Sequence, residues 1–179
     1  MTDVITLLTT DHREVDSLFE RVLTGGLTGD GLVDAVNSII HDLSVHASAE
    51  EVVLYPAIRD ELADGERLAD EAIEEHSRVE KALKELDGRD PAEEDVALLV
   101  ARIAAEVRHH VEEEEGDLFE RMRVEMSAER LDELGERLER AKAVVPTRPH
   151  PSAPDTPPGN LLVGPPTGLI DRLRDAISR

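Results

Sequence analysis

Between residue 3 and about residue 143, apolar residues recur at the three- and four-residue spacing of an α-helix, and no stretch alternates as a β-strand does. Short breaks such as TGGLTGDG and DGRDP divide this region into long segments. Short breaks favour antiparallel packing of successive helices. The sequence therefore predicts an all-α fold, an up-down-up-down four-helix bundle with a short fifth helix.

The expected helix boundaries follow from the apolar stripes and from the residues that interrupt them. The four long helices are expected over residues 4–23, 32–55, 66–86 and 92–126. Pro56 is expected to bend or stop the second helix, because proline disfavours helical backbone in the residue before it. Ser127 is expected to cap the fifth helix, whose leucines form a further apolar stripe.

The composition changes abruptly after Val145. Eight of the ten prolines lie between residues 146 and 166, a density that requires an extended or disordered chain. The segment GLIDRLRDAISR that follows is amphipathic at helical spacing. We expect one folded domain over residues 1–145, and a Pro-rich extension over 146–179 that ends in a short helix and wraps the bundle or a neighbouring chain.

Charge and composition exclude several classes of function. Lys and Arg total 20 against 41 Asp and Glu, a net charge of −21, which repels nucleic acid and anionic membranes and favours cations. The absence of cysteine excludes disulfides, thiolate-bound zinc and iron–sulfur clusters. The chain shows neither an apolar run of about 18 residues nor the basic start of a signal peptide, so a cytoplasmic location is expected. The oligomeric state is not determined by these features.

Histidines and glutamates recur on the inward faces of the expected helices. Positions four apart on a helix differ by roughly 40° and share a face, which applies to His46 with Glu50 and to the second such pair, His110 with Glu114. A histidine also lies within the apolar stripe of the first helix and of the third. The candidate metal ligands are His12, His46, Glu50, His76, His110 and Glu114.

These positions repeat at one offset of 64 residues. The offset joins His12 to His76, His46 to His110, Glu50 to Glu114 and Tyr55 to Phe119. Since the chain has only seven histidines in 179 residues, two histidine matches at one spacing are informative. We infer two similar helix pairs related by a pseudo-two-fold axis, each supplying two histidines and one glutamate.

A histidine on an apolar face is usually a hydrogen-bonded core residue rather than a ligand. Four imidazoles and two carboxylates gathered in one core would, without a cation, leave buried polar groups unpaired at about 1–3 kcal/mol each. A bound metal removes that cost. The set as a whole therefore favours a metal site.

Other polar residues allow more than one interpretation. Glu51 and Glu115 lie five residues after their histidines and are expected in solvent, and His41, His109 and His150 are expected at the surface or behind the ligands. Asp16 and Glu80 are either solvated or additional ligands or acceptors from a ligating imidazole. Tyr55 is a core residue, a metal ligand, a hydrogen-bond donor to a bound oxygen species or a radical carrier.

Imidazole and carboxylate ligands without sulfur suit iron, manganese or zinc. The ligand count indicates two metal ions. If each is six-coordinate, four histidines and two bridging glutamates fill about eight of roughly twelve positions, and an oxo or hydroxo bridge fills about two more. The remaining open positions suit oxygen, peroxide or nitric oxide.

The motifs LLTTDH, HASAEEVVLYP, EEH and HHVEEEEGDLF, taken in order over residues 1 to about 125, resemble the hemerythrin-like (HHE cation-binding) domain. The Pro-rich tail is similar to that of actinobacterial members. The resemblance implies a non-heme di-iron site in a four-helix bundle with the six ligands named above. Oxygen-carrying hemerythrins have a further histidine where this chain has Glu80, and an aspartate five residues after the fourth-helix histidine where this chain uses Glu114 at four.

These departures make the site more anionic and argue against reversible oxygen carriage. The expected function is sensing or detoxification of oxygen, peroxide or nitric oxide, with peroxide- or nitric-oxide-consuming oxidoreductase activity as the enzymatic form. Iron storage, or regulation by metal without turnover, is the alternative. The sequence shows neither a nucleophile triad nor a phosphate-binding loop.

Overall fold

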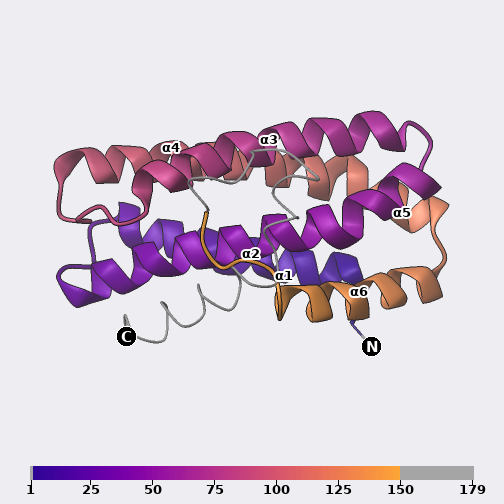
Figure 1. Cartoon of the computed structure of the whole chain (residues 1–179), viewed down its shortest axis with the longest axis horizontal. Coiled ribbons are helices and arrows are strands. Elements are labelled where there is room, and N and C mark those ends of the chain that lie inside the picture. The colour runs from indigo at the N-terminus through magenta and orange to yellow at the C-terminus, as the bar shows by residue number, and fades with distance from the viewer. Residues whose placement is uncertain (1, 150–179) are drawn as a thin grey trace.

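The computed structural model describes residues 2–149, which form helices and no strand within that range. The helical segments are α1 (Val4–Leu23), α2 (Asp30–Glu61), α3 (Gly65–Leu86), α4 (Glu94–Glu113), the π-helix η1 (Glu114–Leu118), α5 (Phe119–Glu125) and α6 (Ala128–Lys142). Helices α1 to α4 form the bundle, and α6 packs along α1 and α2 (Figure 1). The predicted helical bundle is confirmed.

Helix α1 and helix α6 begin where the sequence signals place them. The carboxylate of Asp3 accepts a hydrogen bond from the Thr6 backbone N–H at 3.0 Å, and Ser127 Oγ accepts from the Arg130 N–H at 3.2 Å. Each bond satisfies a backbone donor in the first helical turn that has no partner within the helix. The capping role predicted for Ser127 is confirmed.

Helix α2 does not stop at Pro56 but continues to Glu61. Proline removes one backbone donor, and Pro56 faces solvent. Beyond it, Ala57 and Ile58 are buried in the core. Packing of these residues extends the helix past the proline, and the alternative that Pro56 stops it is wrong.

The apolar core is divided into two clusters by a layer of histidines and glutamates. One cluster surrounds Tyr55 and Phe119 and includes the inner face of α6, whereas the other surrounds Phe19 and Ile103 at the opposite end of the bundle. In α1, His12 lies between Leu8 of the first cluster and Val15 of the second. The polar layer therefore crosses the bundle near its middle.

Two glycines allow close approaches between helices. A Cβ atom on Gly65 would lie 1.9 Å from the carbonyl oxygen of Ile58, and one on Gly135 would lie 2.4 Å from that of Thr2. Larger residues would push α3 away from the end of α2, or α6 away from the start of α1. Both positions therefore require glycine for tight packing.

The segment after α6 crosses the surface of the bundle as far as residue 149 (Figure 1). Arg148 is 6% exposed and donates to Asp87 at 2.6 Å and to Asn37 at 3.3 Å. The expected extension and its terminal helix fall mainly on residues 150–179, outside the described residues. No helix described between residues 2 and 149 has the length and apolar character that a membrane span requires.

Candidate metal centre

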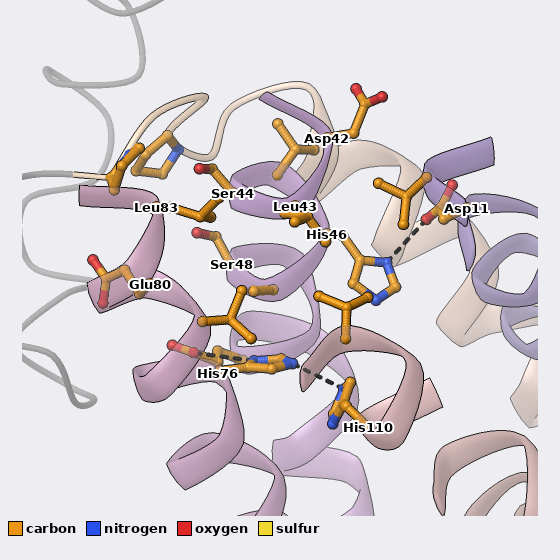
Figure 2. Close-up of a pocket in the computed structure, with 18 of the residues that line it drawn as sticks. Asp11, Asp42, Leu43, Ser44, His46, Ser48, His76, Glu80, Leu83 and His110 are labelled. Atoms are coloured by element: carbon orange, nitrogen blue, oxygen red, sulfur yellow. Dashed lines mark hydrogen bonds and ion pairs between the residues drawn. The ribbon is translucent and has the colours of Figure 1, made fainter. Parts of the chain in front are cut away.

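All six candidate ligands are buried and converge in the middle of the bundle. Helices α1, α2, α3 and α4 each contribute one histidine, α2 adds a glutamate, and the first residue of η1 adds the other. The exposed fractions are 3% for His12, 8% for His46, 0% for Glu50, 6% for His76, 5% for His110 and 2% for Glu114. Figure 2 shows three of these histidines, His46, His76 and His110, close together beneath Leu43 and Leu83.

Each inner carboxylate lies between histidines of the two halves of the repeat. Glu50 Oε2 is 3.2 Å from His46 Nε2 and 3.3 Å from His76 Nε2. Glu114 Oε2 is 3.4 Å from His12 Nε2 and 3.6 Å from the Nε2 atom of His110. All four histidines thus direct Nε2 toward a carboxylate oxygen in the centre.

The candidate ligand atoms form two adjacent groups that share Glu50. One group contains His12, His46, Glu50 and Glu114, and the other contains Glu50, His76 and His110. Within each group the atoms lie within 4.8 Å of one another, a separation suited to a single cation. Two bridging glutamates were expected, but only Glu50 belongs to both groups, whereas Glu114 belongs to the first alone.

A second set of carboxylates contacts the outward Nδ1 atoms of the same histidines. The pairs are Asp11 with His46 at 3.3 Å, Glu51 with His76 at 3.3 Å, Glu75 with His110 at 2.9 Å and Glu115 with His12 at 2.9 Å. Each carboxylate is adjacent in sequence to a candidate ligand, but contacts a histidine of the next helix. The contacts therefore run in a closed ring from α1 through α2, α3 and α4 back to α1.

The expectation that Glu51 and Glu115 are solvated is wrong. Glu51 is only 9% exposed, and both carboxylates hold imidazoles. The 64-residue repeat carried a signal for this arrangement, because Glu51 and Glu115 keep that offset and so do Asp11 and Glu75. Helical-wheel geometry within one helix did not reveal these contacts, because each carboxylate contacts a histidine on another helix.

Several buried atoms of the inner layer have no hydrogen-bond partner within residues 2–149. They are His12 Nε2, both carboxylate oxygens of Glu50, and Glu114 Oε2. Their distances of 3.2–3.6 Å to neighbouring groups permit charge attraction without well-oriented hydrogen bonds. Unpaired buried oxygens are costly, and a cation bound among them would remove the cost. The residues therefore fit a metal site.

Residues 3–122 match the family model for the hemerythrin HHE cation-binding domain. The chain belongs to this family. It is 26% identical to an uncharacterised hemerythrin-like protein of Schizosaccharomyces pombe, over all of this chain and 88% of that protein. It is 29% identical to a DNA nickase of Nostoc, over 77% of this chain but only 38% of the nickase.

A solved structure shows the same fold. A hemerythrin HHE cation-binding-domain protein from Mycobacterium kansasii superimposes with a TM-score of 0.68 and 21% identity, covering 80% of this chain and 89% of that one. The family match and the two buried groups together establish a metal-binding hemerythrin-like domain.

The charges of the hemerythrin-like site are strongly coupled. Burial lowers the pKa of His76, but Glu50 and Glu51 outweigh it and raise that pKa to about 10. In the same way, Glu114 overcomes the burial of His12 and raises its pKa. Burial raises the pKa of Glu114, yet the charges of His110 and His12 hold it at about 2. Without metal, the site therefore keeps protons on histidine and charge on carboxylate.

Tyr55 lies beside the three-residue group. Its hydroxyl is 3.0 Å from His76 Nε2 and donates to Glu114 Oε1 at 3.5 Å. Burial, together with the charge of Glu50 and Glu114, raises the pKa of Tyr55 well above its usual value. The phenol is therefore a proton-bearing group directed at the centre, whereas its repeat partner Phe119 stacks near His12 with ring centroids 6.1 Å apart.

The remaining candidates lie outside the inner layer. Asp16 pairs with Arg108 at 2.7 Å, and Glu80 pairs with Lys84 at 3.3 Å while lining the neighbouring cavity. Neither belongs to the two buried groups. His109 is at the surface with Glu113, 3.5 Å away.

The helix that carries the second His–Glu pair changes its winding at the glutamate. The sequence predicted one helix over residues 92–126, but η1 replaces α-helical geometry between Glu114 and Leu118. Short π-helical turns inside α-helices are frequent at functional sites. This one begins at a candidate ligand and contains Glu115, which holds His12.

Proposed function

We propose that this hemerythrin-like domain binds two iron ions and reacts with oxygen, peroxide or nitric oxide, in sensing or detoxification. The observation that carries the proposal is Glu50, a fully buried carboxylate shared by the two ligand groups. A carboxylate common to two adjacent cation sites is the arrangement expected of a bridging ligand. His12, His46, His76, His110 and Glu114 would supply the remaining protein ligands.

The donor set favours iron. Four imidazoles and two carboxylates, with no cysteine in the chain, match the preferences of iron and manganese, and carboxylate charge stabilises the higher oxidation state. When bound, the metals would supply the redox chemistry. An oxo or hydroxo bridge would complete the pair.

The surrounding residues would orient the ligands and exclude water. Each outer carboxylate accepts from Nδ1–H of a histidine, which fixes the tautomer that leaves Nε2 free to ligate. Tyr55 holds its proton beside the three-residue group and can donate a hydrogen bond to an exogenous oxygen species there. With only three protein groups, that side offers more open positions than the other.

Metal analysis combined with optical spectroscopy tests the proposal. After anaerobic iron loading, we expect close to two iron ions per chain, and visible absorption that changes on addition of peroxide, oxygen or nitric oxide. Glu50→Ala should lower iron content sharply. Glu74→Ala, at an exposed position of α3, is the matched control and should load normally.

Two results would contradict the proposal. Less than about one iron per chain would argue against a two-metal centre. Bound iron that is easily lost and does not react with oxygen, peroxide or nitric oxide would instead support the storage alternative.

A further inference from the structure

A cavity of about 270 Å³ adjoins the histidine layer on the side of the core cluster around Phe19. Its floor includes the four candidate histidine ligands, three of which appear in Figure 2. Its apolar wall is formed by Val15, Leu43, Val79, Leu83, Val107 and Val111. Residues of all four bundle helices therefore build a mainly apolar chamber that ends at the proposed metals.

The chamber is much larger than the small ligands of the proposed function require. A water molecule occupies about 30 Å³ in the liquid, and an apolar cavity of about 150 Å³ holds benzene. Oxygen, nitric oxide and hydrogen peroxide are close to water in size. The volume therefore fits an organic molecule with an apolar body larger than benzene.

The charges around the chamber select against anions. Asp11, Glu14, Asp42 and Glu80 line it along with two cations, Lys142 and Arg148. Lys142 pairs with Asp11, and Arg148 pairs with Asp87, so carboxylates already neutralise both cations. The lining carboxylates that remain would repel an organic acid at this rim, whereas they would not repel a neutral molecule.

We propose that the chamber binds a small neutral organic hydroperoxide, with its apolar body against Val79, Leu83 and Val107 and its peroxide group toward His76 and His110. This inference rests on the proposed function, since it names a substrate class for the same centre. When bound in the ferrous state, two iron ions would supply one electron each to break the O–O bond of ROOH, and two protons from solvent would complete an alcohol and a water. An external one-electron reductant would return both ions to the ferrous state before the next reaction.

Binding can be tested without turnover by using the product alcohol of cumene hydroperoxide, 2-phenyl-2-propanol. We expect it to bind the full-length chain, both metal-free and zinc-loaded, and to shift the NMR signals of the chamber methyl groups. Val79→Phe would fill the chamber and should weaken binding at least tenfold. Val22→Phe, a partly buried valine packed against the same core cluster but outside the chamber, is the matched control and should bind normally.

Reaction rates provide a second measurement. With ferrous-loaded protein in a single reaction, Val79→Phe should lower the ratio of the second-order rate constant for oxidation by cumene hydroperoxide to that for hydrogen peroxide at least tenfold, and Val22→Phe should leave it unchanged. Absence of alcohol binding, or an unchanged ratio in Val79→Phe, would overturn the chamber inference while leaving the di-iron proposal intact. If iron-loaded protein reacts with no oxidant at all, the proposed function fails, even where the alcohol still binds.

Discussion

Glu75 on α3 accepts a hydrogen bond from Nδ1 of His110 on α4 at 2.9 Å, so the histidine of one helix is oriented by the residue that precedes the histidine of another. The hydrogen bond from His110 lowers the pKa of Glu75 against the effect of burial. The carboxylate is therefore ionised at neutral pH and holds the imidazole with Nε2 directed inward.

We expect Glu75→Ala to lower metal affinity by about 10- to 100-fold, because His110 would lose the group that orients it and increases its basicity. Competition with a chromophoric chelator measures the change. Glu74→Ala removes a neighbouring exposed carboxylate from the same helix and should alter affinity little. Equal losses in both variants would show a general charge effect rather than support of His110.

Metal binding should release protons. At pH 7 the metal-free site holds a proton on His76, whose pKa is about 10, and the raised pKa of His12 favours a proton there as well. A metal ion must displace them, whereas Glu114, with a pKa of about 2, is already ionised. Apparent affinity should therefore rise with pH up to about 10, because the competing proton on His76 is lost as pH approaches its pKa. Calorimetry in buffers of different ionisation enthalpy counts the protons, and a count of zero would contradict this charge state.

The stability of the metal-free protein should fall at alkaline pH. The folded-state pKa of His76 lies above its unfolded value of 6.5, so its contribution is complete below that pH and is lost as pH rises through about 10. Chemical unfolding with a chelator present, at several pH values from 6.5 to 10, measures the trend. The zinc-loaded protein should show a weaker decline, because a metal replaces the proton. A flat profile without metal would contradict the raised pKa.

Tyr55→Phe should separate packing from chemistry. The ring is buried in the core, so the variant should lose only about 0.5–1.5 kcal/mol from the missing hydrogen bond. Iron content should be retained. The reaction with peroxide or nitric oxide should slow, because the variant has no phenol hydroxyl to donate a hydrogen bond to the bound peroxide or nitric oxide. Stopped-flow absorption measures the rate. Phe119→Leu, at the repeat-related position, should reduce stability more than reaction rate.

Gly135→Ala should loosen the contact between α6 and the start of α1. The added methyl group would overlap the Thr2 carbonyl, and overpacking of this kind costs about 1–3 kcal/mol. Thermal unfolding measures the loss. Gly116→Ala is a suitable comparison, since nothing lies within 4 Å of a Cβ placed there. Similar losses in both variants would indicate a backbone effect other than helix propensity, because alanine has the higher propensity.

The sequence predicted the bundle and the six inner residues because both depend on periodicity. His46 with Glu50 and His110 with Glu114 share a face by helix geometry alone. His12 and His76 lie within apolar stripes, and the 64-residue offset linked the two halves without reference to tertiary contacts. The structure brings all six together. Their role as metal ligands remains the proposal made above.

The outer carboxylates could not be found in the same way. Whether Glu51 reaches His76 depends on how α2 is rotated against α3, which no single-helix pattern contains. The continuation of α2 past Pro56 likewise depends on burial of the residues that follow. The π-helical turn that begins at Glu114 could not be predicted either, because residues 112–115 are all glutamate and show no periodic pattern.

The closed ring of histidine–carboxylate contacts has an evolutionary consequence. Of its four contacts, Asp11 with His46 and Glu75 with His110 stay within a half of the repeat, whereas the other two cross between halves. A single helical hairpin therefore leaves one of its two histidines unsupported, but two copies of one hairpin complete every contact. Duplication and fusion of a self-associating hairpin would be the shortest route to this centre, and Tyr55 opposite Phe119 marks where the two copies have diverged.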